Sequence, residues 1–421
     1  MSRRASTLLY SCVVYFGFGI ITAAIGPLLP DLAKSNGTGL AEIGLVFTGL
    51  FLGAVLSQFV AGPIADRAGR KPVFLFGVVL MVAATVGLTA SRVPALTLAF
   101  ALLWGIGLGA TELAANVLIA ELFAERSVSA LNLLNVFYGL GAFAGPALVS
   151  LSWERWHTGM PALWVGAVVL VSQIPVVVRL AEDRAAGLSA AGRTSGEIPA
   201  VGAAGVGDVG RGRAVYRSPF LWVLGAALLV YVGTEQMVGG WATVYMTRTT
   251  AIAISSAALV ASGFWIAFTL GRIAAAAVGA RLAPRVVLAA SLAEAAAGIL
   301  LVNLGTGNIG LSIAGFLLTG FGFGPIYPTA IAIIGRFFAG ATGKAIGTAG
   351  ALGSVGGMVL PFLDGVFIAR LGPAAGAHFA IFAVLGIVVL SALARLASGR
   401  PATPEHAATP PRAKKGEITA Y

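Results

Sequence analysis

The stretch GPIADRAGRKP, residues 62–72, places Asp66, Arg67, Arg70 and Lys71 within six positions of a chain in which only 10% of residues are charged. The surrounding sequence is 58% hydrophobic, and its mean hydropathy of +0.93 is far above that of an ordinary soluble domain. The composition therefore predicts a membrane protein, with this charge cluster in a very short polar loop between two apolar spans.

Working outward from the cluster, we find twelve runs long enough to cross a bilayer as helices, which takes about 20 mostly apolar residues. Their predicted limits are 8–30, 42–61, 72–91, 95–120, 130–151, 162–180, 219–241, 254–278, 286–304, 309–334, 346–368 and 377–397. The charge cluster falls between the second and the third of these spans.

The N-terminal run does not resemble a signal peptide, because the apolar stretch after Arg3 and Arg4 is too long and no polar domain follows it. We expect this first span to stay in the protein. Cys12 is the single cysteine, so neither an intrachain disulfide nor a thiolate metal cluster can form. The sequence predicts no cofactor and no metal site.

The basic residues are distributed asymmetrically about the predicted spans. With the N-terminus inside, 21 Lys and Arg residues lie on the cytoplasmic side, 5 lie outside and Arg272 lies within a helix. This bias follows the positive-inside rule, so both termini are expected in the cytoplasm and the protein in the cell (inner) membrane. A nucleic-acid interface is not expected, because no basic groove with interleaved aromatic residues remains.

A polar interval at 181–217 divides the spans into two sets of six. We predict an N-terminal half (1–180), a cytoplasmic linker (181–217), a C-terminal half (218–398) and a cytoplasmic tail (399–421). At an offset of 215 residues, GIGLGATELAA (105–115) aligns with GFGFGPIYPTA (320–330), and GAFAGP (141–146) aligns with GGMVLP (356–361). The halves are therefore predicted to be parallel repeats. Their glycines fit close helix packing better than a dinucleotide site, which needs a preceding strand.

Twelve spans, a central linker, parallel halves and the motif after the second span together resemble the major facilitator superfamily. Its loop signature, G-x-x-x-D-R-x-G-R-R/K, is matched by Gly62, Asp66, Arg67, Gly69, Arg70 and Lys71. The resemblance implies an all-α fold of twelve transmembrane helices in two parallel-repeat halves. It also implies that the loop latches neighbouring helices and biases the equilibrium between inward- and outward-facing states. The alternative is a cluster that only sets topology.

Acidic residues inside the spans are functional candidates, since a charge at mid-membrane costs about 2.5–3.5 kcal/mol on insertion scales. We identify Glu112, Glu235 and Glu294. Asn116 lies one turn after Glu112, on the same helix face, and Gln236 adjoins Glu235. Glu294 has no polar neighbour at helical spacing, so we interpret it as a helix-packing residue.

The motifs TELAAN, ALNLLNVFYGLGAFAGP, YVGTEQ and PIYPTA resemble the fucose permease branch of the superfamily, whose members are sugar:proton symporters. The resemblance implies that Glu112 couples transport to protons. It also implies that Asn135, Tyr138, Glu235 and Gln236 line the sugar cavity. The first span departs from the pattern, because AIGPLLP has Gly26 where the branch carries an acid.

The residue types also favour a polar solute. Amide and carboxyl groups bind hydroxyl groups, and aromatic faces stack on sugar rings. The predicted substrate-binding residues are Asn116, Asn135, Tyr138, Glu235, Gln236, Trp241 and Tyr327. Removal from water favours the neutral form of a carboxyl group, which suits Glu112 as a proton carrier. The alternative for each aromatic residue is core packing. We also expect Asn132 to pack, and Arg272 to snorkel or to pair locally.

We therefore predict a secondary transporter that moves a small polar solute together with a proton, with a sugar as the first candidate. Its expected partners are that solute, the proton and the lipid bilayer, and it is expected to act as a monomer, although the oligomeric state is not readable. Proton-coupled drug efflux shares the loop signature and stays an alternative, as does a non-transporting sensor. An enzyme is not predicted, because His157, His378 and His406 have no catalytic partners in the sequence.

Overall fold

A computed structural model of the protein describes residues 3–123, 127–187, 215–278, 281–338 and 342–397. In these residues, twelve helical spans are long and apolar enough to cross a membrane, which confirms the predicted number. The N-terminal half contains α1 (Arg3–Asn36), α2 (Leu40–Ile43), α3 (Leu45–Ala68), α4 (Arg70–Ala90), α5 (Pro94–Phe123), α6 (Ser127–Trp156) and α7 (Pro161–Gly187). The C-terminal half contains α9 (Pro219–Thr250), α10 (Ile254–Val278), α11 (Pro284–Leu304), α12 (Ile309–Phe323), α13 (Ile326–Phe337), α14 (Thr342–Leu371) and α15 (Pro373–Ala397).

The two halves repeat each other in helix order and in helix limits. When α6 is shifted by 215 residues, its limits coincide with those of α14, and α4 shifted in the same way matches α11 to within one residue. The packing repeats as well, since α5 lies between α3 and α4 while α12 lies between α10 and α11. The chain is therefore an all-α protein of two parallel repeats.

Glycines at the repeat offset bring helix backbones into direct contact. A Cβ atom on Gly105 of α5 would overlap the Leu50 carbonyl of α3, and one on Gly320 of α12 would overlap the Phe264 carbonyl of α10. Gly107 and Gly322 meet α4 and α11 in the corresponding way. The interpretation of these glycine repeats as helix-packing surfaces is confirmed.

The tenth span is interrupted, although we predicted one continuous helix over 309–334. Helix α12 ends at Phe323 and α13 begins at Ile326, with Gly324 and Pro325 between them. Pro325 has no N–H group, so it cannot bond to the carbonyl four residues earlier. Hydropathy does not register this lost hydrogen bond, which explains why the sequence analysis missed the break.

The charge cluster occupies two helix ends and a single connecting residue, where we predicted a short loop. Helix α3 continues through Arg67 to Ala68, Gly69 adopts φ +94°, and α4 begins at Arg70. Only glycine tolerates this backbone conformation without strain. Arg67 is exposed and Lys71 is buried, whereas the side chain of Asp66 and the surroundings of Gly62 lie outside the described part.

The predicted limits of the halves differ from the helices at one point. Helix α7 continues to Gly187, beyond the predicted end of the N-terminal half at residue 180. Its final turns are polar and charged, so hydropathy ended the span before the helix did. Most of the predicted linker (188–214) and the tail (398–421) lie outside the described residues.

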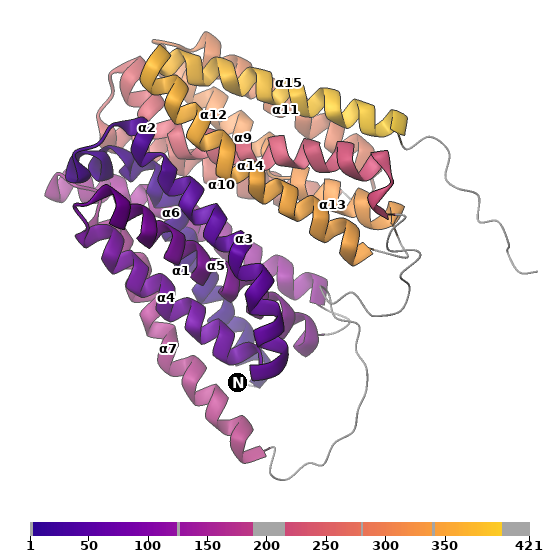
Figure 1. The fold of residues 1–421 in the computed structure, drawn as a ribbon. Helices are drawn as coiled ribbons and strands as arrows, with labels where there is room; N and C mark the ends of the chain where they lie inside the picture. Colours follow the sequence, from indigo (N-terminus) through magenta and orange to yellow (C-terminus); the bar gives the residue numbers. More distant parts are fainter. Residues whose placement is uncertain (1–2, 124–126, 188–214, 279–280, 339–341, 398–421) are drawn as a thin grey trace, which may run out of the picture.

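The halves meet at one end and separate toward the other (Figure 1). At the meeting end, Gly26 of α1 lies against Gly240 of α9, and Phe47 of α3 lies against the same glycine. The Thr48 hydroxyl donates a hydrogen bond to the Met358 carbonyl of α14, at 2.9 Å. We call this region, which includes α2, the closed end. The opposite end, where α1 begins and α7 terminates, is the open end.

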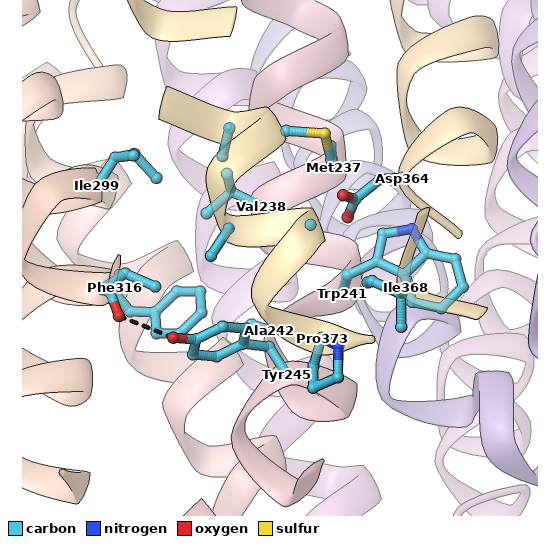
Figure 2. Close-up of a pocket in the computed structure, with 14 residues that line it drawn as sticks. Met237, Val238, Trp241, Ala242, Tyr245, Ile299, Phe316, Asp364, Ile368 and Pro373 are labelled. Carbon is cyan, nitrogen blue, oxygen red and sulfur yellow. Dashed lines mark hydrogen bonds between the residues drawn. The ribbon is translucent and has the colours of Figure 1, made fainter. Parts of the chain in front are cut away.

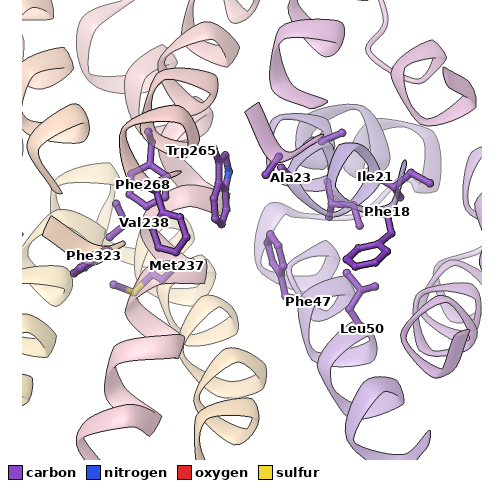
Figure 3. Packing of buried hydrophobic residues seen from close by; sticks show 14 of the residues in the cluster. Phe18, Ile21, Ala23, Phe47, Leu50, Met237, Val238, Trp265, Phe268 and Phe323 are labelled. Carbon is purple, nitrogen blue, oxygen red and sulfur yellow. The ribbon is translucent and has the colours of Figure 1, made fainter. Parts of the chain in front are cut away.

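Between the two ends, each half contributes an apolar surface near the molecular centre (Figure 3). Phe18, Phe47 and Leu50 belong to the N-terminal half, and Trp265, Phe268 and Phe323 belong to the C-terminal half; all are buried. The polar side chains described next lie among these helices.

Candidate functional site

Five polar side chains from both halves interact near the centre of the molecule. Tyr138 of α6 interacts electrostatically with Glu112 of its own half and with Glu235 and Arg272 of the other half. Tyr327 of α13 interacts with the same three charged groups. We call Glu112, Tyr138, Glu235, Arg272 and Tyr327 the central polar group. It joins the two predicted functional carboxylates in one site.

Glu112 lies half-buried on α5, beside a hydrogen bond that links α5 to α1. The Tyr15 hydroxyl donates to Asn116 Oδ1 at 3.0 Å, and Tyr15 also interacts electrostatically with Glu112. Among the described residues, no hydrogen bond to the Glu112 carboxyl group is observed. This carboxyl group can therefore receive a proton or a solute hydroxyl. Sequence reasoning missed Tyr15, because its position depends on how α1 packs against α5.

Glu235 is more enclosed than Glu112 and is held by its neighbours. Its side chain is 8% exposed, and Gln236 Nε2 donates to Glu235 Oε1 at 3.2 Å. Tyr231, one turn earlier on α9, interacts with Glu235 and donates its hydroxyl to the Phe323 carbonyl at 2.8 Å. The Glu235 carboxylate is thus positioned as a fixed acceptor.

Arg272 connects Glu235 to the break between α12 and α13. Its Nε donates to the Gly324 carbonyl at 3.2 Å, and its guanidinium lies 4.4 Å from the centre of the Phe268 ring. Within a continuous helix, Gly324 would bond to residue 328, but Pro328 has no N–H to donate. Arg272 satisfies that carbonyl and also interacts electrostatically with Glu235. The expected local contact exists, yet this side chain also belongs to the central polar group.

Two further predicted substrate residues lie on α6. Asn135 is exposed, and its Nδ2 donates to the Leu131 carbonyl of its own helix at 3.0 Å. The ring of Tyr138 is half-buried, with its centre 5.5 Å from that of Phe18. Asn132, which we expected to pack, is exposed instead. The α6 surface before Tyr138 therefore offers amide groups to its surroundings.

Trp241 lies apart from the central polar group. It is 2% exposed, and its Nε1 donates to the Pro361 carbonyl of α14 at 2.9 Å. The indole packs against Gly44 of the N-terminal half and Gly365 of α14, at the closed end. In this conformation its ring is occupied by helix packing and its N–H group by a backbone carbonyl.

A further acid escaped the sequence analysis, which found three acids within the spans. Asp364 lies on α14 within a membrane span and is 3% exposed. It lies inside the predicted span 346–368, so an acidic residue within an apolar run was the signal that could have found it. Glu294, on α11, is half-buried and is not among the groups that interact with the central tyrosines.

A family model described as the Major Facilitator Superfamily matches residues 11–248 and 226–420 of this chain. Two curated proteins match shorter segments. The "Sodium-dependent glucose transporter 1" of Rattus norvegicus is 30% identical over 141 residues, which are 33% of this chain and 29% of that protein. The "4-hydroxybenzoate transporter PcaK" of Pseudomonas aeruginosa is 33% identical over 182 residues, which are 41% of this chain and 38% of that protein. These matches thus span well under half of either relative.

Solved structures match over nearly the whole chain. The nucleoside transporter NupG has a TM-score of 0.73 at 14% identity, and the match covers 95% of this chain and 100% of that one. The transporter FucP, described as being in the outward conformation, has a TM-score of 0.63 at 20% identity, and the match covers 95% of this chain and 100% of that one. At such identities the likeness establishes the fold alone.

Proposed function

Because the chain belongs to the major facilitator superfamily, we propose that it is a secondary transporter that couples a proton to the movement of a small, uncharged polar solute, with sugars as the first candidates. The observation that carries this proposal is the central polar group. It combines carboxylates from opposite halves, and a central site between repeats is where such transporters bind their substrates.

The arrangement of the halves supports alternating access. The closed end is held by backbone contacts such as Gly26 with Gly240, while the halves separate toward the open end (Figure 1). Rocking one half against the other would exchange the two ends while keeping the central polar group between them. The excess of Lys and Arg assigns the open end to the cytoplasm. In this proposal the structure represents the inward-facing state.

The two carboxylates have different roles in this proposal. Glu112 has no hydrogen-bond donor among the described residues, so its charge is free to change as it binds and releases the coupling proton. Glu235 accepts a hydrogen bond from Gln236 and lies within electrostatic range of the opposite charge of Arg272. Glu235 and Gln236 would therefore accept and donate hydrogen bonds to the solute.

The charge of the site favours a neutral solute. With Glu112 protonated, the remaining charges of Glu235 and Arg272 cancel, so an uncharged ligand adds no unpaired charge to the membrane interior. Asn116, Asn135, Tyr138 and Tyr327 supply further groups for solute hydroxyls. A cationic drug would instead need a negative countercharge, which an ionised Glu112 could supply. The efflux alternative therefore requires a different protonation state of Glu112 when the ligand is bound.

The proposal is tested by ligand-dependent stability followed by transport. We expect neutral sugars to raise the melting temperature of the purified protein, by mass action on the folded state. The panel should include nucleosides, aromatic acids and cationic drugs as matched competitors. A stabilising sugar should then accumulate in proteoliposomes when a proton gradient is imposed. Stabilisation by cationic drugs alone would instead support efflux.

A further inference from the structure

Asp364 lines a cavity that is formed by helices of the C-terminal half and is separate from the central polar group (Figure 2). The cavity has a volume of about 30 Å³, enough for one or two water molecules. Helices α9, α11, α12, α14 and α15 form its wall, and apart from Asp364 the wall is largely apolar. The carboxyl group of Asp364 points toward Met237 across this space.

The carboxyl group lacks a donor in its surroundings. Its Oδ1 atom is buried and has no hydrogen-bond partner in the described structure. Two polar side chains share the cavity wall, but both are engaged elsewhere. Trp241 Nε1 donates to the Pro361 carbonyl at 2.9 Å, and the Tyr245 hydroxyl donates to the Val302 carbonyl at 2.7 Å.

Nor is there a compensating charge. No charged group lies within electrostatic range of Asp364 in the part of the chain that the structure describes. Apart from the phenol of Tyr245, titratable groups on the helices packed around it lie elsewhere. Exposed examples are Glu42 (α2), Arg248 (α9), Arg285 (α11), Arg336 (α13), Arg370 (α14) and His378 (α15), and Glu294 (α11) is half-buried. Glu235 of α9 is engaged in the central polar group.

These surroundings select the protonated form of the carboxyl group. An ionised carboxylate in an apolar cavity is strongly disfavoured without a donor or a countercharge, whereas a neutral carboxylic acid is tolerated. The site therefore holds a proton as long as water cannot reach it.

The cover over the cavity is part of the closed end. Trp241 lines the cavity on one side and packs against Gly44 of the N-terminal half on the other. Its neighbour Gly240 is the residue that Gly26 and Phe47 contact. Separating the halves at this end would remove that support from Trp241 and admit water to the carboxyl group.

We propose that Asp364 is a proton-binding site gated by the closed end, protonated while that end is shut and ionised when it opens. This inference rests on the proposed alternating access but not on the identity of the solute. Since the proton binds the closed form preferentially, a rise in pH shifts the population toward the form that is open at this end. One such site contributes a shift of up to about tenfold per pH unit.

The test measures conformation without any solute. Spin labels at Gly39→Cys and Leu371→Cys lie on opposite halves at the closed end, in a background where Cys12 is replaced by alanine. Residue 39 has open space around it and Leu371 is 71% exposed, so both tolerate a label. Pulsed electron paramagnetic resonance in lipid nanodiscs should show a longer-distance population that grows as the pH is raised.

Asp364→Asn should reduce the steepness of this response by up to about tenfold per pH unit, whatever Glu112 contributes. Asp364→Leu, an apolar replacement of similar volume, should reduce the response in the same way. This second variant keeps the test possible if Asp364→Asn does not fold. The matched control is Asp31→Asn, because Asp31 is a buried carboxylate near the closed end that already accepts bonds from the Thr158 hydroxyl at 3.0 Å and the Gly159 N–H at 2.7 Å. This control should keep the parent response.

An unchanged pH response in both Asp364 variants would overturn the proposal, as would a parent protein whose distances do not respond to pH. A response lost equally in Asp31→Asn would also overturn it, because it would reveal general destabilisation. Failure of the protein to transport any sugar, with the Asp364-dependent response intact, would count against the proposed function alone.

Discussion

At the scale of single residues, the two central carboxylates differ in their freedom to titrate. The Glu112 carboxyl group accepts no hydrogen bond from the described residues, whereas Glu235 is held by Gln236 and influenced by Arg272. A group that must gain and lose a proton in each cycle is better placed without fixed donors. This difference leads to separate expectations for the two glutamine variants.

Glu112→Gln should abolish accumulation driven by a proton gradient but retain counterflow at equal pH, because exchange does not require the empty carrier to return. Glu235→Gln should instead weaken solute affinity by roughly 10- to 100-fold, the value of one charge-assisted hydrogen bond. Both are measured in proteoliposomes. If Glu112→Gln still concentrates the solute against its gradient, Glu235 becomes the carboxylate to test for coupling.

Some of these residues could be read from the sequence and others could not. Glu112, Glu235 and Tyr327 are recognisable because polar residues are rare in apolar spans and because the repeat offset pairs two of them. Tyr15 comes next to Asn116 through the packing of α1 on α5, and Arg272 is positioned by the broken backbone at Gly324. Sequence spacing carries no information about such contacts between distant helices.

At the scale of helices, small residues decide how closely the repeats pack. Gly105→Ala would overlap the Leu50 carbonyl, so we expect a loss of about 1–3 kcal/mol of stability, the usual cost of overpacking. The matched control is Gly347→Ala on α14, because nothing lies within 4 Å of the added methyl group. Thermal denaturation in detergent should show a lower melting temperature for Gly105→Ala than for the parent protein, and no decrease for Gly347→Ala. Equal melting temperatures for the two variants would contradict the packing role of Gly105.

The junction of α3 and α4 provides a second expectation for helix ends. If Asp66 latches neighbouring helices, Asp66→Asn should leave expression normal and slow transport roughly 5-fold or more, a typical size for a conformational coupling energy. A cluster that only sets topology predicts little change, since acids contribute weakly to the positive-inside rule. The measurement is the initial rate of uptake in vesicles, normalised to the amount of inserted protein.

Helix number and order were predictable because an apolar run of sufficient length is a local signal. The positions of the helix ends were less predictable. The polar end of α7 and the interruption at Gly324 and Pro325 both depend on hydrogen bonding, which hydropathy does not measure. The dipeptide Gly324–Pro325 is visible in the sequence. Because proline has no backbone N–H group to donate, this dipeptide could have been used to predict the break.

At the scale of the whole molecule, the two ends should differ in accessibility. Leu371→Cys, at the closed end, should react with a membrane-impermeant thiol reagent in intact cells, in a background lacking Cys12. Tyr216→Cys, at the open end and 47% exposed as tyrosine, should react only after lysis. The reverse labelling pattern would invert the proposed orientation.

The contact between Gly26 and Gly240 has a practical consequence for capturing the opposite state. Even a single methyl group on Gly26 would overlap the Gly240 carbonyl, so the larger side chain of an aspartate could not fit between the two backbones. Gly26→Asp should therefore act as a wedge that props the halves apart at this end. Such a trapped variant would be a natural starting material for raising conformation-selective antibodies and for determining the outward-facing structure.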